Sequence, residues 1–219
     1  MKNVKSEFTY GRVYHVFNRS NNREKLFKET DNKLYFLSLC RDKLKGYMHI
    51  HAYALLENHF HLAIAIKEKH QILDYIVNLP TVDKRKADTN FLNSSELNQD
   101  INGLIRTQFS RVFNSYSQAI NKRYNRKGNL FNHSVKRSII NSEPRFANLI
   151  YYIHHNSRKH GIYKNFINVK WHSYHEIIDN SSDLIEYKFV LNWFGGLEAF
   201  KEYHQGKYLE KDFHSFWIE

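Results

Sequence analysis

The sequence predicts an α+β protein in which helices pack on a mainly antiparallel sheet. Segments with the two-residue alternation of strands are interleaved with segments of helical periodicity. Two apolar runs, 49–56 and 59–66, are separated only by Glu57-Asn58, which predicts a tight antiparallel hairpin. Interleaved strands and helices around such a hairpin favour a layer of helices on one sheet.

Each expected element has its own local signal. The run 11–17 alternates like a strand, and Pro144 suits the first turn of a helix. Residues 81–100 are polar and without a clear period, which predicts a loop or flexible insertion. The remaining expectations are helices at 32–45, 71–79, 101–124, about 144–159 and 183–194, another from Leu197, and a last strand at 132–140.

The charge balance points to a polyanionic partner. Lys and Arg number 33 against 22 Asp and Glu, giving a formal net charge of +11. Aromatic residues make up 16% of the chain, and exposed aromatic rings can stack bases in single-strand binders. No secretory signal and no membrane span are evident, and Cys40 sits in an apolar helical pattern as a buried, inert thiol. A cytoplasmic location is therefore expected.

The strand ENHFHLAIAI carries a candidate metal site. Alternation places Phe60 and Leu62 on one side and His59 and His61 on the other, next to the small side chain of Ala63. Two imidazoles that project together can bind a divalent cation if a third ligand comes from elsewhere. The alternative is an ordinary half-exposed strand with two chance histidines, since the chain has 14.

The helical segment EPRFANLIYYIHHNSRKHG carries a candidate nucleophile. At about 100° per residue, Tyr152 lies on the flank of the apolar face and Asn156 lies one turn further on the same side. Tyr151 is expected to point toward solvent. The alternative is that Tyr152 is one amphipathic tyrosine among 15.

Together these segments resemble the HUH single-tyrosine transposases, and in particular the REP-associated tyrosine transposase branch. The branch's N-H-h-H element is matched by Asn58-His59-Phe60-His61 and its Y-I-H-x-N-P helix by 152–157, with Ser157 in place of proline. YHVFNRSNN at 14–22, NKRYNRKGNLF at 121–131, WHSY at 171–174 for the family's W-S-S-Y, and the tail WFGGLEAFKEYH also match in order. The matches span about residues 10–205.

The resemblance implies a ferredoxin-like or RRM-like palm over residues 1–165 and a helical C-terminal extension over 166–219. It implies that Tyr152 is the nucleophile and that His59, His61 and Asn156 bind Mg²⁺ or Mn²⁺. Single-stranded or hairpin DNA would be cleaved and rejoined through a 5′-phosphotyrosine. His154 and His155 are candidate general bases only by nearness. Phosphate contacts are expected from Arg123, Arg126, Lys127, Lys136 and Arg137, and also from Asn18 and Arg19.

Three alternatives stay open at the level of sequence. The chain could be a catalytically silent DNA-binding or RNA-binding protein on the same fold, or a nickase of the replication-initiator or relaxase type. It could also be a metalloprotein that binds no nucleic acid, which the charge disfavours. Each basic residue could simply belong to a solvated surface. A monomer and a homodimer are both compatible with the sequence.

Overall fold

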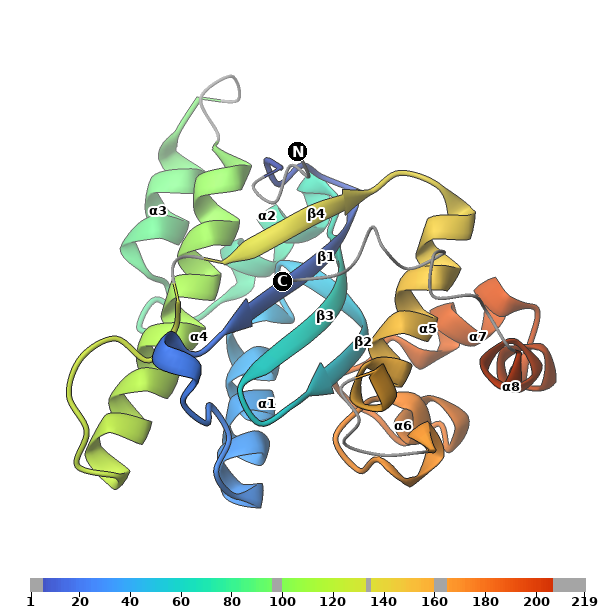
Figure 1. The fold of residues 1–219 in the computed structure, drawn as a ribbon. Coiled ribbons are helices and arrows are strands. Elements are labelled where there is room, and N and C mark those ends of the chain that lie inside the picture. Colours follow the sequence, from blue (N-terminus) through green and yellow to red (C-terminus); the bar gives the residue numbers. More distant parts are fainter. Residues whose placement is uncertain (1–5, 96–99, 133–134, 160–164, 207–219) are drawn as a thin grey trace.

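A computed structural model of the protein describes residues 6–95, 100–132, 135–159 and 165–206. A split β-α-β-β-α-β core is followed by short helices (Figure 1). The strands are β1 (Val13–Arg19), β2 (Met48–Leu55), β3 (His59–Ile66) and β4 (Lys136–Ile140). The α-helices are α1 (Thr30–Leu44), α2 (Lys69–Asn78), α3 (Lys86–Asn93), α4 (Ile101–Arg123), α5 (Glu143–Lys159), α6 (Tyr174–Ile178), α7 (Tyr187–Phe194) and α8 (Leu197–Gln205). Short 3₁₀ turns are η1 (Asn21–Arg23) and η3 (Phe166–Asn168).

The sheet has the strand order β2-β3-β1-β4, and each neighbouring pair is antiparallel. This order confirms the predicted α+β class and the predicted hairpin. Directly opposed residues share a face, so the register fixes which side chains meet. Phe17 lies opposite His61 on β3 and Lys136 on β4, whereas Val16 lies opposite Leu62 and Arg137.

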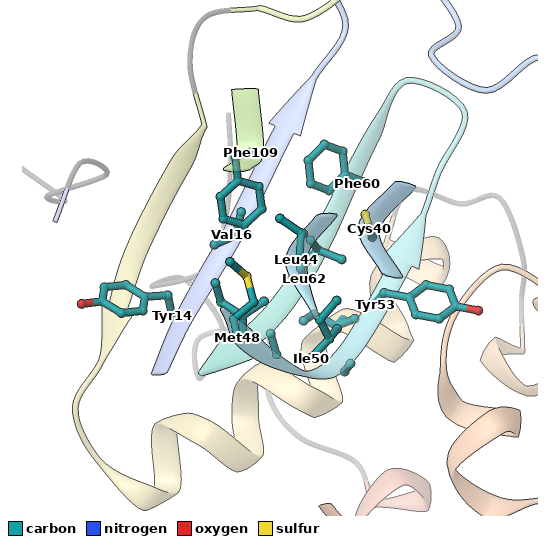
Figure 2. Packing of buried hydrophobic residues seen from close by; sticks show 14 of the residues in the cluster. Tyr14, Val16, Cys40, Leu44, Met48, Ile50, Tyr53, Phe60, Leu62 and Phe109 are labelled. Atoms are coloured by element: carbon teal, nitrogen blue, oxygen red, sulfur yellow. The ribbon is translucent and has the colours of Figure 1, made fainter. Parts of the chain in front are cut away.

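One face of the sheet packs on α1 and α4 to form the main hydrophobic core. Phe60 is fully buried, with its ring centroid 4.9 Å from that of Phe36 in α1 and 5.8 Å from that of Phe113 in α4. Figure 2 shows side chains of this face, among them Val16 and Leu62, beside Phe109 of α4. Cys40 is buried here as predicted, and burial raises the pKa of its thiol.

The opposite face, which carries His59 and His61, is covered by α5 over β2 and β3 (Figure 1). The short helices α6, α7 and α8 lie on the outer side of α5. The chain at residues 171–173 runs along the edge of β2, where Leu55 N–H donates to Trp171 O at 2.8 Å and Ser173 N–H donates to Tyr53 O at 3.0 Å. Helix α5 is therefore enclosed between the sheet and the C-terminal helices.

Several boundaries differ from those expected. Residues 81–100 were expected to be a loop or insertion, but this segment contains α3, and residues 96–99 lie outside the described part of the chain. The helix is held by Asp88, which is fully buried and accepts hydrogen bonds from Tyr47 Oη at 2.7 Å and Gln108 Nε2 at 3.2 Å. A tertiary partner stabilises this helix, and that partner is invisible to local periodicity. The last strand begins at Lys136, and α7 begins at Tyr187 rather than near 183.

In the described part of the chain, no helix has the length and apolar character needed to cross a membrane.

His51 is a buried histidine at an irregularity in β2, where the register shifts between Ile50 and Ala52. Its ring stacks on Phe189 at 4.7 Å and meets Phe146 edge-on at 5.5 Å. Neither ring nitrogen has a hydrogen-bond partner within the described part of the chain. Burial, and secondarily His49, lowers its pKa to about 3, so it is neutral in the folded protein.

We expect His51 to make the fold acid-labile. Its pKa is depressed by folding, so the unfolded chain binds a proton first as pH falls below about 6.5. The contribution of neutral His51 to the free energy of unfolding is fully present above about pH 6.5 and is lost as the pH falls toward 3. At pH 5 the loss is about 2 kcal/mol for one such group relative to pH 8. Urea unfolding at several pH values should give a shallower decline for His51→Phe, and identical declines would contradict this account.

Candidate active site

Strands β1 and β3 bring three histidines to one face of the sheet. His59 and His61 project together, as their alternation predicts, and their ring centroids are 5.1 Å apart. His15 on β1 shares this face, and its Nε2 lies 2.9 Å from Nδ1 of His61. Sequence analysis missed His15, because only the β1–β3 register places it beside His61. The alternation of residues 11–17 predicts which face of the strand carries His15, but it does not predict that His61 lies beside it.

Helix α5 places Tyr152 against these rings. The Tyr152 ring centroid lies 5.4 Å from that of His61 and 5.9 Å from that of His15, both edge-to-face. The side chain is 5% exposed. Burial raises the pKa of the phenol, and a hydrogen bond with Asn156 acts more weakly in the opposite direction. The hydroxyl is thus neutral in the protein alone.

Asn156 lies one helical turn after Tyr152, is fully buried, and faces His59. Its Oδ1 is 3.2 Å from Nε2 of His59, while Nδ1 of the same ring is 2.7 Å from Oδ1 of Asn58. If Nδ1–H donates to Asn58, Nε2 presents a lone pair toward the amide oxygen of Asn156. Two acceptors then face each other, an arrangement that a cation between them would stabilise.

The donor set suits a divalent cation. Ligands at right angles around an octahedral ion are about 3 Å apart, given metal–ligand bonds of about 2.1 Å. The 3.2 Å between His59 Nε2 and Asn156 Oδ1 matches such a pair of positions. Because His15 holds Nδ1 of His61, Nε2 would be the nitrogen that coordinates. In the described ranges no three His, Cys, Asp or Glu form a metal-binding group, so a cation bound here would need the amide of Asn156 as well as the imidazoles.

His154, also on α5, faces away from the sheet into a chain of buried hydrogen bonds. The carbonyl of Phe200 can only accept, so His204 Nδ1–H donates to it at 2.8 Å. His204 Nε2 then accepts from His154 Nδ1–H at 2.8 Å, and His154 Nε2 accepts from Ser173 Oγ–H at 2.9 Å. Burial lowers the pKa of His154 and takes that of His204 to about 3, so both rings are neutral.

This arrangement rules out His154 as the general base suggested by its sequence position. Both of its nitrogens are engaged, and its ring contacts the C-terminal helices. His155 is also turned away from the sheet, with Nδ1 3.0 Å from the Tyr151 carbonyl and its ring tilted against that of Phe166, with the centroids 3.9 Å apart.

Tyr151 was expected to point toward solvent, and that expectation is wrong. The side chain is 7% exposed, its ring stacks on His155 at 3.8 Å, and its hydroxyl donates to Gly206 O at 3.2 Å. The helical wheel gave the correct direction, away from the sheet. The C-terminal helices cover that direction, and the periodicity of α5 carries no information about them.

Two of the predicted phosphate-binding cations lie beside the candidate centre. Arg19 is exposed and lies opposite His59 in the β1–β3 register. Lys136 shares this face across β1, and its pKa is lowered first by burial and then by the nearby charge of Arg19. Two cations that repel each other form a site that an anion would stabilise.

The structure argues against two other predicted contacts. Arg137 follows Lys136, so it projects from the opposite face, where it is 5% exposed and donates to Ser6 O at 2.6 Å. Its guanidinium also lies over the ring of Phe8 at 4.6 Å. Asn18 is likewise buried on the core face, opposite Phe60. Neither side chain is placed to reach a phosphate.

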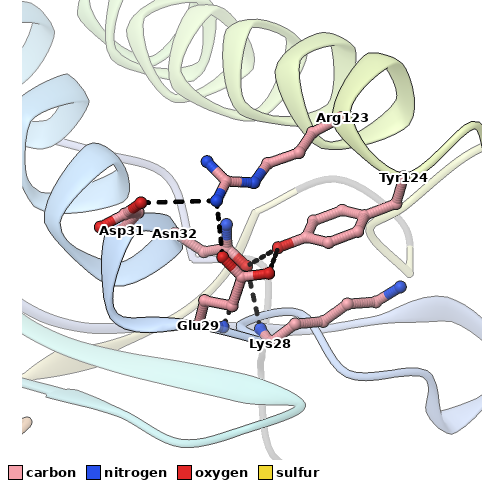
Figure 3. Close-up of polar contacts among 6 residues, drawn as sticks. All are labelled: Lys28, Glu29, Asp31, Asn32, Arg123 and Tyr124. Carbon is pink, nitrogen blue, oxygen red and sulfur yellow. Dashed lines mark hydrogen bonds and ion pairs between the residues drawn. The ribbon is translucent and has the colours of Figure 1, made fainter.

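The remaining predicted cations lie near the end of α4. Arg123 pairs with Glu29 at 2.6 Å and Asp31 at 3.4 Å, joining α4 to the start of α1 (Figure 3). Arg126 pairs with Glu24 at 3.0 Å. The Arg123 pairs are exposed and contribute little to stability, so a phosphate can compete for this guanidinium. Arg126 is only 14% exposed and is held by its partner. Lys127 is exposed.

We expect the His204–His154–Ser173 chain to fix the orientation of α5. His204→Phe removes the acceptor for His154 Nδ1–H and leaves a buried donor unsatisfied, at a cost of about 1–3 kcal/mol. Hydrogen exchange should accelerate at the backbone amides of α5, and urea unfolding should show the loss of stability. His70→Phe is the matched control, because it makes the same substitution at an exposed position of α2. Unchanged exchange in α5 would contradict the positioning role.

Comparison with solved structures supports the fold. The structure of a REP-associated tyrosine transposase bound to a REP hairpin is similar with a TM-score of 0.53, covering 85% of this chain and 90% of that one at 14% identity. A bacterial tRNA(His) guanylyltransferase (Thg1)-like protein in complex with GTP gives a TM-score of 0.43 at 11% identity, over 73% and 68% of the two chains. No family model matches the sequence. No curated protein matches it either. At these identities the first likeness establishes a shared α+β fold.

Proposed function

We propose that the protein is a transposase-type endonuclease and strand transferase that cleaves and rejoins single-stranded, hairpin-bearing DNA. The observation that carries this proposal is the meeting of Tyr152 with His61 and of Asn156 with His59 on one face of the sheet. A nucleophile and a candidate ligand set thus converge from α5 and β3. The net charge of +11 and the fold shared with a hairpin-bound transposase add support.

The chemistry follows from the residues present. Tyr152 Oη forms a bond to the scissile phosphorus, the bond to the 3′-oxygen breaks, and that oxygen leaves with a proton as a 3′-hydroxyl. Rejoining is the reverse, in which a 3′-hydroxyl attacks the 5′-phosphotyrosine and the phenol is released. Mg²⁺ or Mn²⁺ held by His59, His61 and Asn156 would supply positive charge for the phosphate oxygens and for the phenolate. Arg19 and Lys136 would hold phosphates beside the centre.

Tyr152→Phe should abolish covalent capture of DNA and leave binding within about twofold, because it removes only the nucleophilic oxygen. The assay incubates the protein with labelled single-stranded hairpin DNA and Mn²⁺ and scores a denaturant-resistant adduct. Tyr151→Phe is the matched control, since its hydroxyl lies on the other side of α5. An adduct that persists in Tyr152→Phe would place the nucleophile elsewhere. Binding without any adduct in the parent protein would favour a binding-only role.

Lys136→Ala should weaken single-strand binding uniformly across sequences and lower the salt dependence by about one ion, because one phosphate contact is lost. Arg137→Ala should mainly destabilise the fold, because its partners Ser6 and Asn102 lie on the core face. Fluorescence anisotropy at several salt concentrations, together with urea unfolding, separates the two effects. If both variants fold well and lose DNA affinity equally, the assignment of phosphate binding to Lys136 and of a structural role to Arg137 is contradicted.

A further inference from the structure

A groove of 340 Å³ lies between α4 and the segment 128–131, outside the candidate active site. The lining residues from α4 recur at spacings of three and four, which places them on one helical face. The polar side chains are Ser110, Asn114, Ser117, Gln118, Asn121 and Asn129. Phe113 and Phe131 are both buried and stack at 4.4 Å beneath them.

The lining is polar but carries no charge, although charged residues make up 25% of the chain. Asn114, Gln118 and Asn129 are exposed, so their amides are accessible to a ligand. Each amide offers donors and an acceptor together, as the edge of a nucleobase does. A bare phosphate or carboxylate would find no cation inside the groove. The side chains that line the groove therefore suit a flat, neutral ligand with both hydrogen-bond donors and acceptors.

The wall opposite α4 is braced rather than loose. Asn121 Nδ2 donates to Gly128 O at 3.1 Å, and Arg126 Nη1 donates to Asn121 Oδ1 at 2.5 Å. Arg126 is itself held by Glu24 at 3.0 Å. Gly128 has φ of +85°, a conformation that side chains rarely adopt. The groove is therefore formed before any ligand arrives, which reduces the entropic cost of binding.

The same segment leads directly to the candidate active site. Asn21 N–H donates to Leu130 O and Asn132 N–H donates to Arg19 O, both at 2.8 Å. Arg19 in turn lies opposite His59. The exposed cations Lys122 and Lys127 stand near the groove in sequence, at the end of α4 and in the turn that follows it. The groove wall and Arg19 are thus joined through neighbouring backbone, so a strand held by Arg19 can continue toward the neutral groove.

We infer that this groove binds unpaired bases of the DNA strand next to the phosphate at the active site, with Asn114 and Gln118 reading base edges. The inference rests on the proposed function, because it takes single-stranded DNA as the substrate. It assigns sequence preference to α4, on the side of the sheet away from α5. Phosphate contacts at Arg19 and Lys136 would then position the strand without reading it.

The test uses full-length Tyr152→Phe protein, which cannot be trapped covalently, and single strands of about twelve nucleotides. Fluorescence anisotropy compares oligo-dT, oligo-dC and oligo-dA with an abasic strand of the same phosphate number. Asn114→Leu and Gln118→Leu remove the amides and keep the side-chain size. Asn192→Leu, an exposed amide on α7, is the matched control.

Each groove variant should reduce the preference among bases, and for bases over the abasic strand, by about tenfold. Affinity for the abasic strand and the salt dependence should stay unchanged, as should every value for Asn192→Leu. Parent-like base preference in both groove variants would overturn the groove assignment while leaving the proposed function in place. A parent protein that binds no single strand would overturn both. Equal losses on base-containing and abasic strands would also overturn base reading.

Discussion

The whole arrangement depends on α5 being enclosed on both sides. Its inner side meets the sheet through Tyr152 and Asn156, and its outer side meets the C-terminal helices through Tyr151 and His154. A helix with no free side cannot roll about its axis without breaking buried hydrogen bonds. The proposed nucleophile Tyr152 and the amide of Asn156 one turn later are therefore held in one orientation, as a reaction with defined geometry would require.

The candidate centre is lined by imidazoles, a phenol and an amide, of which Tyr152 and Asn156 are buried. Burial raises the pKa of the Tyr152 phenol, so its hydroxyl is neutral in the protein alone. Charge is kept at the edge, on Arg19 and Lys136. A phosphodiester approaching this edge would bring its negative charge to the cations first and to the phenol second. The exclusion of water from the buried Tyr152 would then strengthen any charge interaction formed there.

The sequence was sufficient for what depends on local periodicity. Strand alternation placed His59 and His61 on one face, and helical spacing placed Asn156 beside Tyr152. It was insufficient where a residue distant in sequence determines the local structure or the neighbours of a side chain. Helix α3 depends on buried Asp88 and Tyr47, and His15 depends on the register between β1 and β3. Arg137 was assigned to phosphate binding from its charge alone, and charge does not indicate which face of the sheet a side chain occupies. The alternation along β4 places Arg137 and Lys136 on opposite faces.

His15 supports the proposed metal site, although it is not one of the proposed ligands, because it orients the ring of His61. Histidines that bind metals usually have their second nitrogen held by a hydrogen bond, which fixes the ring and its tautomer. Here Asn58 holds Nδ1 of His59 and His15 holds Nδ1 of His61. Both rings are thus oriented through the same nitrogen, so both would coordinate through Nε2. A pair of chance histidines on a half-exposed strand has no need of two such supports. The matched support of the two rings therefore favours a cation site over a surface coincidence.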